Sequence, residues 1–338
     1  MMRVSSVGRE ALPAIQRIEV VHVTSYGYAA PVSLSHHLAH LRPLADAFQQ
    51  LERFTLGVEP APALRSTGAD TFGNACTRFQ LAQPHDSLQV RAASVVAVRP
   101  RFQGLEPARS PAWEAVRARL RYLARGDFEP AVEFAQPSPY VPRLAPLRDW
   151  AASSFAPGRP VAEVALELMR RIHTDFAYRS RSTEIDTPLQ QVLQQRAGVC
   201  QDFAHLLAAA LRMAGLAARY VSGYLLTQPV GGGPALVGAD ASHAWVQLWC
   251  PDTPGVPADG WLDLDPTNDC VPALDHVRVA VGRDYGDVVP LRGVIRGGGR
   301  HMLPPPKRPW RAGADAGSFL ALGCGWSQVC SLKSRELS

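Results

Sequence analysis

Apolar and polar positions alternate with a period of two through most of the first hundred residues. Ile18, Val20 and His22 share one face of the first such segment, and turn-rich patches at 66–74 and 83–86 separate the segments that follow. Short alternating runs bounded by Gly, Asp, Asn and Pro are typical of antiparallel strands. We therefore expect a β-rich, sandwich-like domain.

A helical period replaces this alternation in the second half of the chain. Apolar residues recur at steps of three and four along 161–174 and again along 203–214, and Gly215 is placed to end the second helix. Alternating segments that predict strands follow this helix, at 218–226, 241–249 and 261–265. Helices followed by antiparallel strands predict an α+β core.

These patterns divide the chain into five parts. The predicted parts are an N-terminal extension (1–16), a β-rich domain (17–100), a connecting region (101–160), an α+β core (161–302) and a tail (303–338). The connecting region is rich in Pro, Ala and Arg and is too apolar for a free linker. We expect it to pack on one of the domains that it joins.

Cys200 is placed where a Gly-containing turn runs into the second helix. The unpaired N–H groups and the dipole at a helix N-terminus favour an anion. Such a setting lowers the pKa of a thiol and raises the fraction of thiolate, which is the nucleophilic form. A lone cysteine is more often a buried structural residue, so its position alone does not assign a role.

Two predicted strands downstream carry an imidazole and two carboxylates. His243 lies on one face of the first strand, and Asp263 and Asp265 share one face of the next. Neighbouring antiparallel strands can bring such side chains opposite each other. Acyl transfer from an amide needs a thiolate, an imidazole and a group that orients the imidazole. In chain order the sequence offers Cys200, His243 and a carboxylate, and alternation does not choose between the two aspartates.

Other polar and aromatic residues near these positions have structural interpretations. His205 lies roughly 140° around the helix from Cys200 and is expected to be a half-buried polar partner. Asp202 is expected to stabilise the first helical turn. Trp245 and Trp261 are expected to pack in the core around the site and not to contact substrate.

These residues stand in motifs that closely resemble the bacterial transglutaminase-like superfamily, which includes predicted cysteine proteases. The motifs in the α+β core are Gly198-Val199-Cys200-Gln201-Asp202-Phe203-Ala204-His205, Arg219-Tyr220-Val221-Ser222-Gly223-Tyr224, His243-Ala244-Trp245 and Trp261-x-x-x-Asp265-Pro266-Thr267-Asn268. Three further motifs resemble the β-rich domain that often precedes this core in bacteria: Ser25-Tyr26-Gly27-Tyr28, Leu41-Arg42-Pro43 and Asp70-Thr71-Phe72-Gly73-Asn74. The resemblance covers about residues 17–302, and the order of its motifs makes it specific.

The resemblance implies a papain-like α+β fold with Cys200 as nucleophile, His243 as general acid and base, and Asp265 as the orienting carboxylate. An imidazolium beside a thiolate stabilises the charged pair. The oxyanion would be bound by the backbone N–H of Cys200 and a second donor, for which Tyr178 or Gln201 is a candidate.

The activity implied is thiol-dependent cleavage or exchange of amide bonds in a peptide or protein substrate through a Cys200 thioester. Hydrolysis is the simpler expectation, because cross-linking needs a site that admits an amine while excluding water. A protein-crosslinking transglutaminase and a non-catalytic interaction scaffold are the alternatives. No single residue distinguishes hydrolysis from transfer.

Composition limits the partners and the compartment. The net charge of +5 comes from arginines scattered along the chain without a basic run, which argues against nucleic-acid binding. No apolar run approaches the roughly 18 residues of a membrane span, and the start does not read as a signal peptide. We therefore expect a cytoplasmic protein without membrane partners.

No cofactor or metal is expected. The six cysteines lack the paired spacing of a zinc site, and a reducing compartment fits them. Two weak alternatives are a histidine cluster at His36, His37 and His40, and a poorly spaced zinc site formed by Cys250, Cys270 and His276.

The tail departs from the family resemblance. Three consecutive prolines at 304–306 lack N–H donors and cannot form a ladder strand. The residues that follow show no convincing period, and Cys324 and Cys330 within them receive no role. We therefore expect a tail that does not supply the closing strand of the family and that leaves a sheet edge open.

Overall fold

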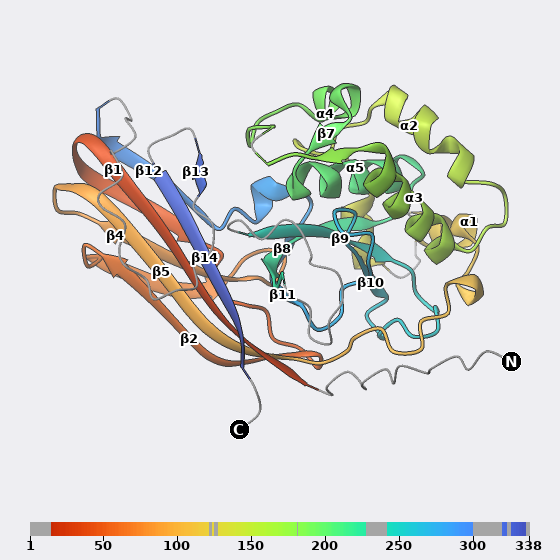
Figure 1. Ribbon diagram of the computed structural model, residues 1–338, viewed down its shortest axis with the longest axis horizontal. Coiled ribbons are helices and arrows are strands. Elements are labelled where there is room, and N and C mark those ends of the chain that lie inside the picture. Colours follow the sequence, from red (N-terminus) through yellow and green to blue (C-terminus); the bar gives the residue numbers. More distant parts are fainter. Residues whose placement is uncertain are drawn as a thin grey trace, which may run out of the picture.

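The computed structural model of the chain describes residues 15–121, 124, 128–180, 182–227, 242–299, 320–322 and 326–335. An eight-stranded sheet makes up the N-terminal domain, and a four-stranded sheet with helices packed against it makes up the second domain (Figure 1). The eight strands are β1 (Gln16–Ala39), β2 (Gln49–Glu59), β3 (Leu64–Ala69), β4 (Ala75–Leu81), β5 (His85–Val98), β12 (Leu291–Gly297), β13 (Leu320–Leu322) and β14 (Trp326–Arg335).

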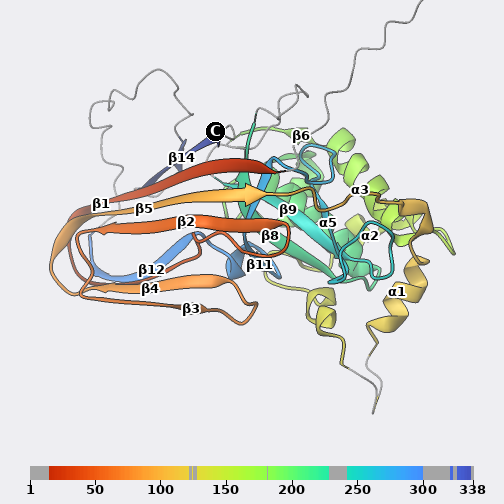
Figure 2. The same cartoon turned by 90° about the horizontal axis from the view of Figure 1, so that it is seen from below.

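Strand β1 belongs to both layers of the N-terminal domain. Its first half pairs antiparallel with β5 and β14, and its second half pairs antiparallel with β4 and β12. The β1–β5 register shifts between Gly27 and Val32, where β1 passes from one layer to the other. Figure 2 shows β1, β5 and β2 in one layer and β12, β4 and β3 in the other. The domain is therefore a sandwich made by folding one continuous sheet.

The predicted alternation is confirmed along β1, where every second residue from Gln16 to Thr24 is buried. Between the layers lies a separate apolar cluster, which includes Leu56, Phe79, Leu81, Leu88 and Val90. Burying a side chain of this size contributes about 1.5–3 kcal/mol. This cluster holds the two layers together.

The C-terminal tail supplies strands, so the expectation of a missing closing strand is wrong. Strand β14 pairs with the first half of β1, from Arg17 opposite Arg335 to Tyr26 opposite Trp326. Cys330 is buried against the core, and the neighbouring strand β13 extends the sheet. The prolines that suggested an irregular tail precede these strands and lie outside the described residues, as does Cys324. A Pro-rich stretch thus does not decide the structure of the residues that follow it.

Helix α5 is the centre of the second domain. It packs on β8 and β9 of the antiparallel sheet β10-β9-β8-β11, with helices α2, α3 and α4 around it (Figure 1). The helices are α1 (Trp113–Arg119), α2 (Ala145–Ala151), α3 (Val161–Asp175), α4 (Leu189–Gln195) and α5 (Cys200–Met213). The strands are β6 (Ala177–Tyr178), β7 (Ala197–Gly198), β8 (Ala218–Leu225), β9 (His243–Trp249), β10 (Trp261–Leu264) and β11 (His276–Gly282). This arrangement is the α+β core that the sequence predicted.

The connecting region packs into the core of the second domain. It contributes α1, α2 and three 3-10 helices, η1 (Pro107–Arg109), η2 (Pro130–Ala135) and η3 (Ala152–Ser154); a fourth, η4 (Tyr285–Asp287), precedes β12. Side chains from this region and from the first half of β1 belong to one apolar cluster with α3 and α5. None of the helices in the described ranges combines the length and hydrophobicity needed to cross a bilayer.

Two buried amide side chains of the N-terminal domain bind the open edge of the second sheet. The Gln49 amide accepts from the backbone N–H of Arg278 at 2.8 Å and donates to its carbonyl at 2.8 Å. The Asn74 amide makes the same pair with Val281, at 2.8 and 2.7 Å. Both backbone residues lie on β11, the edge strand, so the two amides replace part of a missing neighbour strand.

The Asp70–Asn74 motif forms a turn that holds the Asn74 amide in position. The Asp70 carboxylate accepts from the backbone N–H groups of Phe72 and Asn74 and from the Asn74 side chain, at 2.8–2.9 Å. Gly73 has a φ of +81°, which favours glycine. The loop therefore fixes the Asn74 amide before it meets β11.

Candidate active site

The first turn of α5 holds Cys200 at the N-terminus of a buried helix. The Asp202 carboxylate accepts from the N–H of Val199 at 2.9 Å and from the Thr183 hydroxyl at 2.6 Å, and so caps the turn, as predicted. A Cβ at Gly198 would lie 2.8 Å from an Asp202 carboxylate oxygen, so only glycine fits before the helix. Cys200 is itself partly exposed. These contacts orient the start of α5 and with it the thiol.

His243 and Asp265 form a fully buried pair. Nε2 of His243 lies 2.8 Å from Oδ2 of Asp265, and neither side chain is exposed to solvent. Strand β10 pairs Asp263 with Gln247 of β9. Two residues further along the same register, Asp265 would face Trp245, so its carboxylate reaches His243 diagonally.

The His243 ring joins the carboxylate to the thiol. The Cys200 side chain is hydrogen-bonded to the ring. Since Asp265 occupies Nε2, Nδ1 is the ring nitrogen left for sulfur. Burial lowers the pKa of His243, but Asp265 and Cys200 reverse this effect and raise it to about 10. The ring is therefore an imidazolium at neutral pH, and the three predicted residues are brought together.

Asp265 is surrounded by donors. Its Oδ1 accepts from the backbone N–H groups of Thr267 and Asn268 at 2.9 and 3.3 Å, and its Oδ2 also accepts from the Asn268 amide at 2.7 Å. Burial alone raises the pKa of this carboxyl, but His243 and His276 outweigh burial and hold it well below its usual range. The Asp-Pro-Thr-Asn motif thus builds a turn that holds the carboxylate in place, and the two imidazoles keep it ionised.

His276 is a contact that the sequence did not assign to the site. Its Nε2 lies 3.1 Å from Oδ2 of Asp265, so two imidazoles share one carboxylate oxygen. Within the described part of the chain its Nδ1 has no hydrogen-bond partner. The sequence placed His276 only in a weak zinc alternative. The alternation of residues 276–282 could have predicted a strand that begins at His276. This strand, β11, pairs with β8 in the sheet that also carries His243 on β9.

Trp245 covers both histidines. Its ring stacks on His243 with a centroid distance of 6.0 Å and meets His276 edge-on at 5.2 Å. A Cβ at Gly223 would lie 2.5 Å from this indole and 2.2 Å from the carbonyl of Val277. The glycine of the Ser-Gly-Tyr motif therefore makes room for Trp245, which confirms the packing role expected for this tryptophan.

The remaining candidate residues are not part of the Cys200–His243–Asp265 arrangement. His205 accepts from the N–H of Tyr285 at 3.2 Å, and burial together with Arg212 lowers its pKa to about 3, so it stays neutral. It is more deeply buried than the sequence suggested. The Gln201 amide donates to the carbonyl of Ile185 at 3.3 Å. Trp261 packs over the guanidinium of Arg219 at 4.0 Å.

One group of three potential metal ligands is present among the described residues. Ligand atoms of His243, Asp265 and His276 lie within 4.8 Å of one another. The His243 ring donates to the carboxylate, and a protonated imidazole offers no lone pair to a metal. The geometry therefore favours an ion-pair network. Neither the histidines at 36, 37 and 40 nor the set of Cys250, Cys270 and His276 assembles as a ligand group in these ranges.

The sequence matches two protein families. The bacterial transglutaminase-like N-terminal region matches residues 18–97, and the transglutaminase-like superfamily matches residues 148–266. The second match begins inside the predicted connecting region. It ends just after Asp265, so it includes all three residues of the site.

Curated relatives extend over most of the chain. An uncharacterised protein of Mycobacterium tuberculosis is 43% identical over 287 residues, which are 84% of this chain and 89% of the relative. One from Mycobacterium leprae is 35% identical over 291 residues, 84% and 94% of the two chains. A protein-glutamine gamma-glutamyltransferase of Pseudomonas aeruginosa is 35% identical over 134 residues, 39% of this chain and 19% of that protein.

A solved structure shares the fold. A proposed cysteine protease from Cytophaga hutchinsonii matches 94% of this chain and 98% of its own, with a TM-score of 0.60. The identity is 18%, so this similarity concerns the fold alone.

Proposed function

The chain belongs to the transglutaminase-like superfamily, and from that premise we propose that it cleaves amide bonds in peptides or proteins through a thioester on Cys200. The observation that carries the proposal is the hydrogen-bonded series from the partly exposed Cys200 thiol through buried His243 to buried Asp265. Such a line supplies a nucleophile, a proton carrier and a group that orients the carrier.

In the proposed first step the sulfur attacks the carbonyl carbon of the amide. The C–N bond breaks as His243 gives its proton to the departing nitrogen, and an amine and a thioester result. In the second step His243, now neutral, takes a proton from water while the hydroxyl oxygen attacks the thioester. The C–S bond then breaks and a carboxylic acid leaves, which restores the Cys200 thiolate beside the His243 imidazolium. Asp265 keeps the ring in place throughout.

The negative charge on the carbonyl oxygen needs donors. The N–H groups in the first turn of an α-helix have no partner within the helix, so we propose the Cys200 N–H as one donor. Of the two candidates for the second donor, the Gln201 amide is bound to Ile185. The other candidate is Tyr178, which is half-buried with its ring edge-on to Phe203.

Thiol labelling tests the activated sulfur. Cys200 should react with iodoacetamide faster than Cys76, measured by mass spectrometry of digested protein at neutral pH. Since Cys76 is buried and Cys200 is partly exposed, exposure alone would also favour Cys200. The matched control is His243→Gln, which leaves the position of Cys200 unchanged and should slow its labelling. Equal rates at Cys200 in both proteins would contradict the proposal.

Transfer to an amine is the second candidate, supported by the similarity of part of the chain to a gamma-glutamyltransferase. A peptide library incubated with and without a primary amine separates the outcomes by mass. Cleaved or deamidated peptides indicate hydrolysis, and peptides that gain the amine indicate transfer. Peptides left unchanged by the wild type, or equally changed by Cys200→Ala, would exclude both and favour a scaffold.

A further inference from the structure

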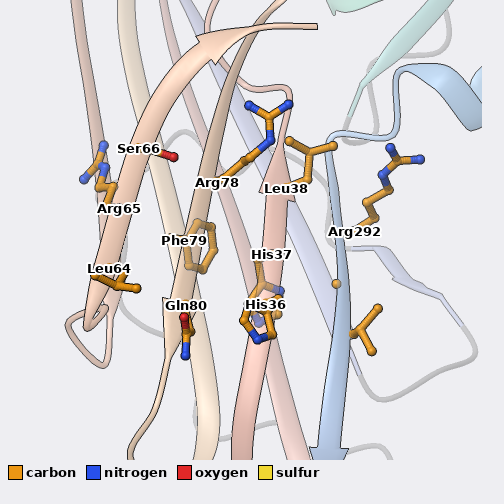
Figure 3. Close-up of a pocket in the computed structure, with 12 residues that line it drawn as sticks. His36, His37, Leu38, Leu64, Arg65, Ser66, Arg78, Phe79, Gln80 and Arg292 are labelled. Atoms are coloured by element: carbon orange, nitrogen blue, oxygen red, sulfur yellow. The ribbon is translucent and has the colours of Figure 1, made fainter.

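One layer of the N-terminal domain consists of β12, the second half of β1, β4 and β3, and its exposed face contains a depression. This depression has a volume of about 680 Å³ and lies over all four strands (Figure 3). A neighbouring depression of about 440 Å³ shares Leu38, Arg78 and Arg292 with it and continues to Phe72. The Phe72 ring packs on Phe134 of the connecting region. We call the two depressions together the groove; it runs from the N-terminal domain to the junction with the second domain.

The strand registers place the side chains of the groove in two rows. The first row crosses the four strands as Val294, His36, Gln80 and Leu64. The second row crosses them as Arg292, Leu38, Arg78 and Ser66. The rows are about 7 Å apart, and four strands span about 14 Å. An extended peptide of about four residues covers that width.

The first row has apolar rims. Leu64 is 65% exposed and Val294 is 75% exposed, and they lie on the two outer strands of the layer. Only three large apolar side chains are strongly exposed in the described ranges, so two of the three border this groove. Exposed apolar side chains gathered around a hollow are typical of a binding surface.

The second row is basic. Figure 3 shows Arg78 and Arg292 on either side of Leu38. Arg78 makes no hydrogen bond or ion pair with the described residues, and no Asp or Glu lines the larger depression. The smaller one contains Asp70 and Asp287, of which Asp287 forms an ion pair with Arg283. Across both depressions Arg65, Arg78 and Arg292 therefore outnumber Asp70, the one lining carboxylate that is not paired with an arginine. The available charge in the groove is therefore positive.

We propose that the groove binds an extended acidic segment of the substrate protein, with carboxylates over the arginines and apolar side chains against Leu64 and Val294. The description of this segment as substrate rests on the proposed function; the binding itself does not. Charge argues against the chain's own residues 300–319 as occupant, because they carry Arg300, Lys307, Arg308 and Arg311 against one aspartate. Opposite charges across an interface favour association and specificity.

Fluorescence anisotropy with the full chain tests the groove. The probe is a fluorescein-labelled peptide of eight residues that alternates glutamate with leucine, and the protein carries Cys200→Ala so that chemistry does not consume the probe. We expect saturable binding that weakens with salt. The double variant Arg78→Glu, Arg292→Glu should weaken it by about tenfold or more, because two attractions become repulsions. Leu64→Ser with Val294→Ser should also weaken binding.

Three controls make the test specific. Arg109→Glu, an exposed charge change away from the groove, should leave the affinity within about twofold. Peptides with glutamine for glutamate, or serine for leucine, should bind more weakly than the probe. Binding that is insensitive to the groove variants, or stronger competition by a DNA oligonucleotide than by unlabelled peptide, would overturn the proposal. Because Cys200 is absent from the assay, failure of the amide chemistry would leave this result unaffected.

Discussion

The candidate active site and the groove use charge in opposite ways. At the active site every charge faces a partner inside the protein: Asp265 accepts from two imidazoles, an amide and two backbone N–H groups. In the groove Arg78 has no partner among the described residues, and Arg292 makes one bond to a backbone carbonyl. Buried charges are costly unless paired, whereas exposed charges are hydrated and remain free to bind another molecule.

This contrast separates residues that create reactivity from residues that select a partner. A change at His243 or Asp265 should alter chemistry and folding together, because each of these buried groups is hydrogen-bonded to the other. A change in the groove should alter recognition and leave folding intact. Five substitutions or conditions test the contrast at decreasing expected size.

Replacing Asp265 by Asn should have the largest effect. The carboxylate that raises the pKa of His243 is lost, so the ring is less able to stay protonated beside the thiol. By analogy with other triads, the rate of amide cleavage should fall by about 10³- to 10⁴-fold. Iodoacetamide labelling of Cys200 near pH 7 should slow as well. Unchanged labelling in a folded Asp265→Asn protein would show that the carboxylate has no electrostatic role.

Alkaline pH should destabilise the wild type through the same pair. The pKa of His243 is raised from 6.5 to about 10 in the folded state, so the protonated ring stabilises the fold below 6.5 and this stabilisation is lost as pH rises through about 10. The pKa of Asp265 is lowered, so its contribution is lost only in acid. The loss on the alkaline side should be on the order of a few kcal/mol.

Urea unfolding at about pH 7 and about pH 10.5 measures this loss. The matched control is Asp265→Asn, in which tyrosines and lysines titrate as before but the ion pair is absent. If the wild type and this variant lose the same stability between the two pH values, the pair does not contribute to the alkaline transition.

Truncating Asn74 or Gln49 to Ala should destabilise the fold without touching the reactive groups. Asn74→Ala leaves both the N–H and the C=O of Val281 without the partner that Asn74 supplies, which costs about 2 kcal/mol. Gln49→Ala leaves the N–H of Arg278 unpaired, but its carbonyl still accepts from the Leu44 N–H at 3.0 Å, so the cost should be nearer about 1 kcal/mol. The adjacent exposed Gln50 provides the control, because Gln50→Ala should change the unfolding free energy by less than about 0.5 kcal/mol. Equal urea midpoints for Gln49→Ala and Gln50→Ala would contradict the role of the amides.

His276 should act as a positioning residue, with a smaller effect on catalysis. His276→Leu removes one donor from Asp265 and should lower kcat/KM by about tenfold, since a hydrogen bond to a charged group contributes about 1.5 kcal/mol. His276→Gln, which keeps a donor, should restore most of the rate. A purely structural role would instead predict that both variants lose stability and rate in parallel, as unfolding and kinetics would show.

Replacing Arg78 by Ala should have the smallest effect on folding, a change below about 0.5 kcal/mol in the unfolding free energy. Arg78 is exposed and makes no hydrogen bond or ion pair with the described residues, so the substitution removes no polar interaction within that part of the fold. Hydrolysis of a short neutral peptide should also be unchanged. A destabilisation as large as that of Asn74→Ala would erase the distinction between the two regions.

Local patterns predicted most of the secondary-structure elements and, together with the family motifs, the three residues that the structure brings together. Alternation and helical period gave the two domains, and the family motifs selected Asp265 over Asp263, which is buried and pairs across the sheet with Gln247. These features depend on neighbours in sequence or in one hairpin. The predicted boundaries of the five parts remain predictions.

Contacts between distant segments could not be predicted in this way. The second imidazole on Asp265 comes from β11, and pairing of β14 with β1 joins residues about three hundred positions apart. The Gln49 and Asn74 bonds join two domains through side-chain geometry that has no sequence period. The groove likewise exists only because three registers align residues of four strands.

The amide bonds to β11 also bear on how the protein can be dissected. A fragment that begins at residue 101 would keep Cys200, His243 and Asp265 but would present the backbone of β11 to other chains, and uncovered strand edges promote self-association. Soluble expression of that fragment alone should therefore be poor. The smallest practical unit for biochemistry is the chain with both of its domains.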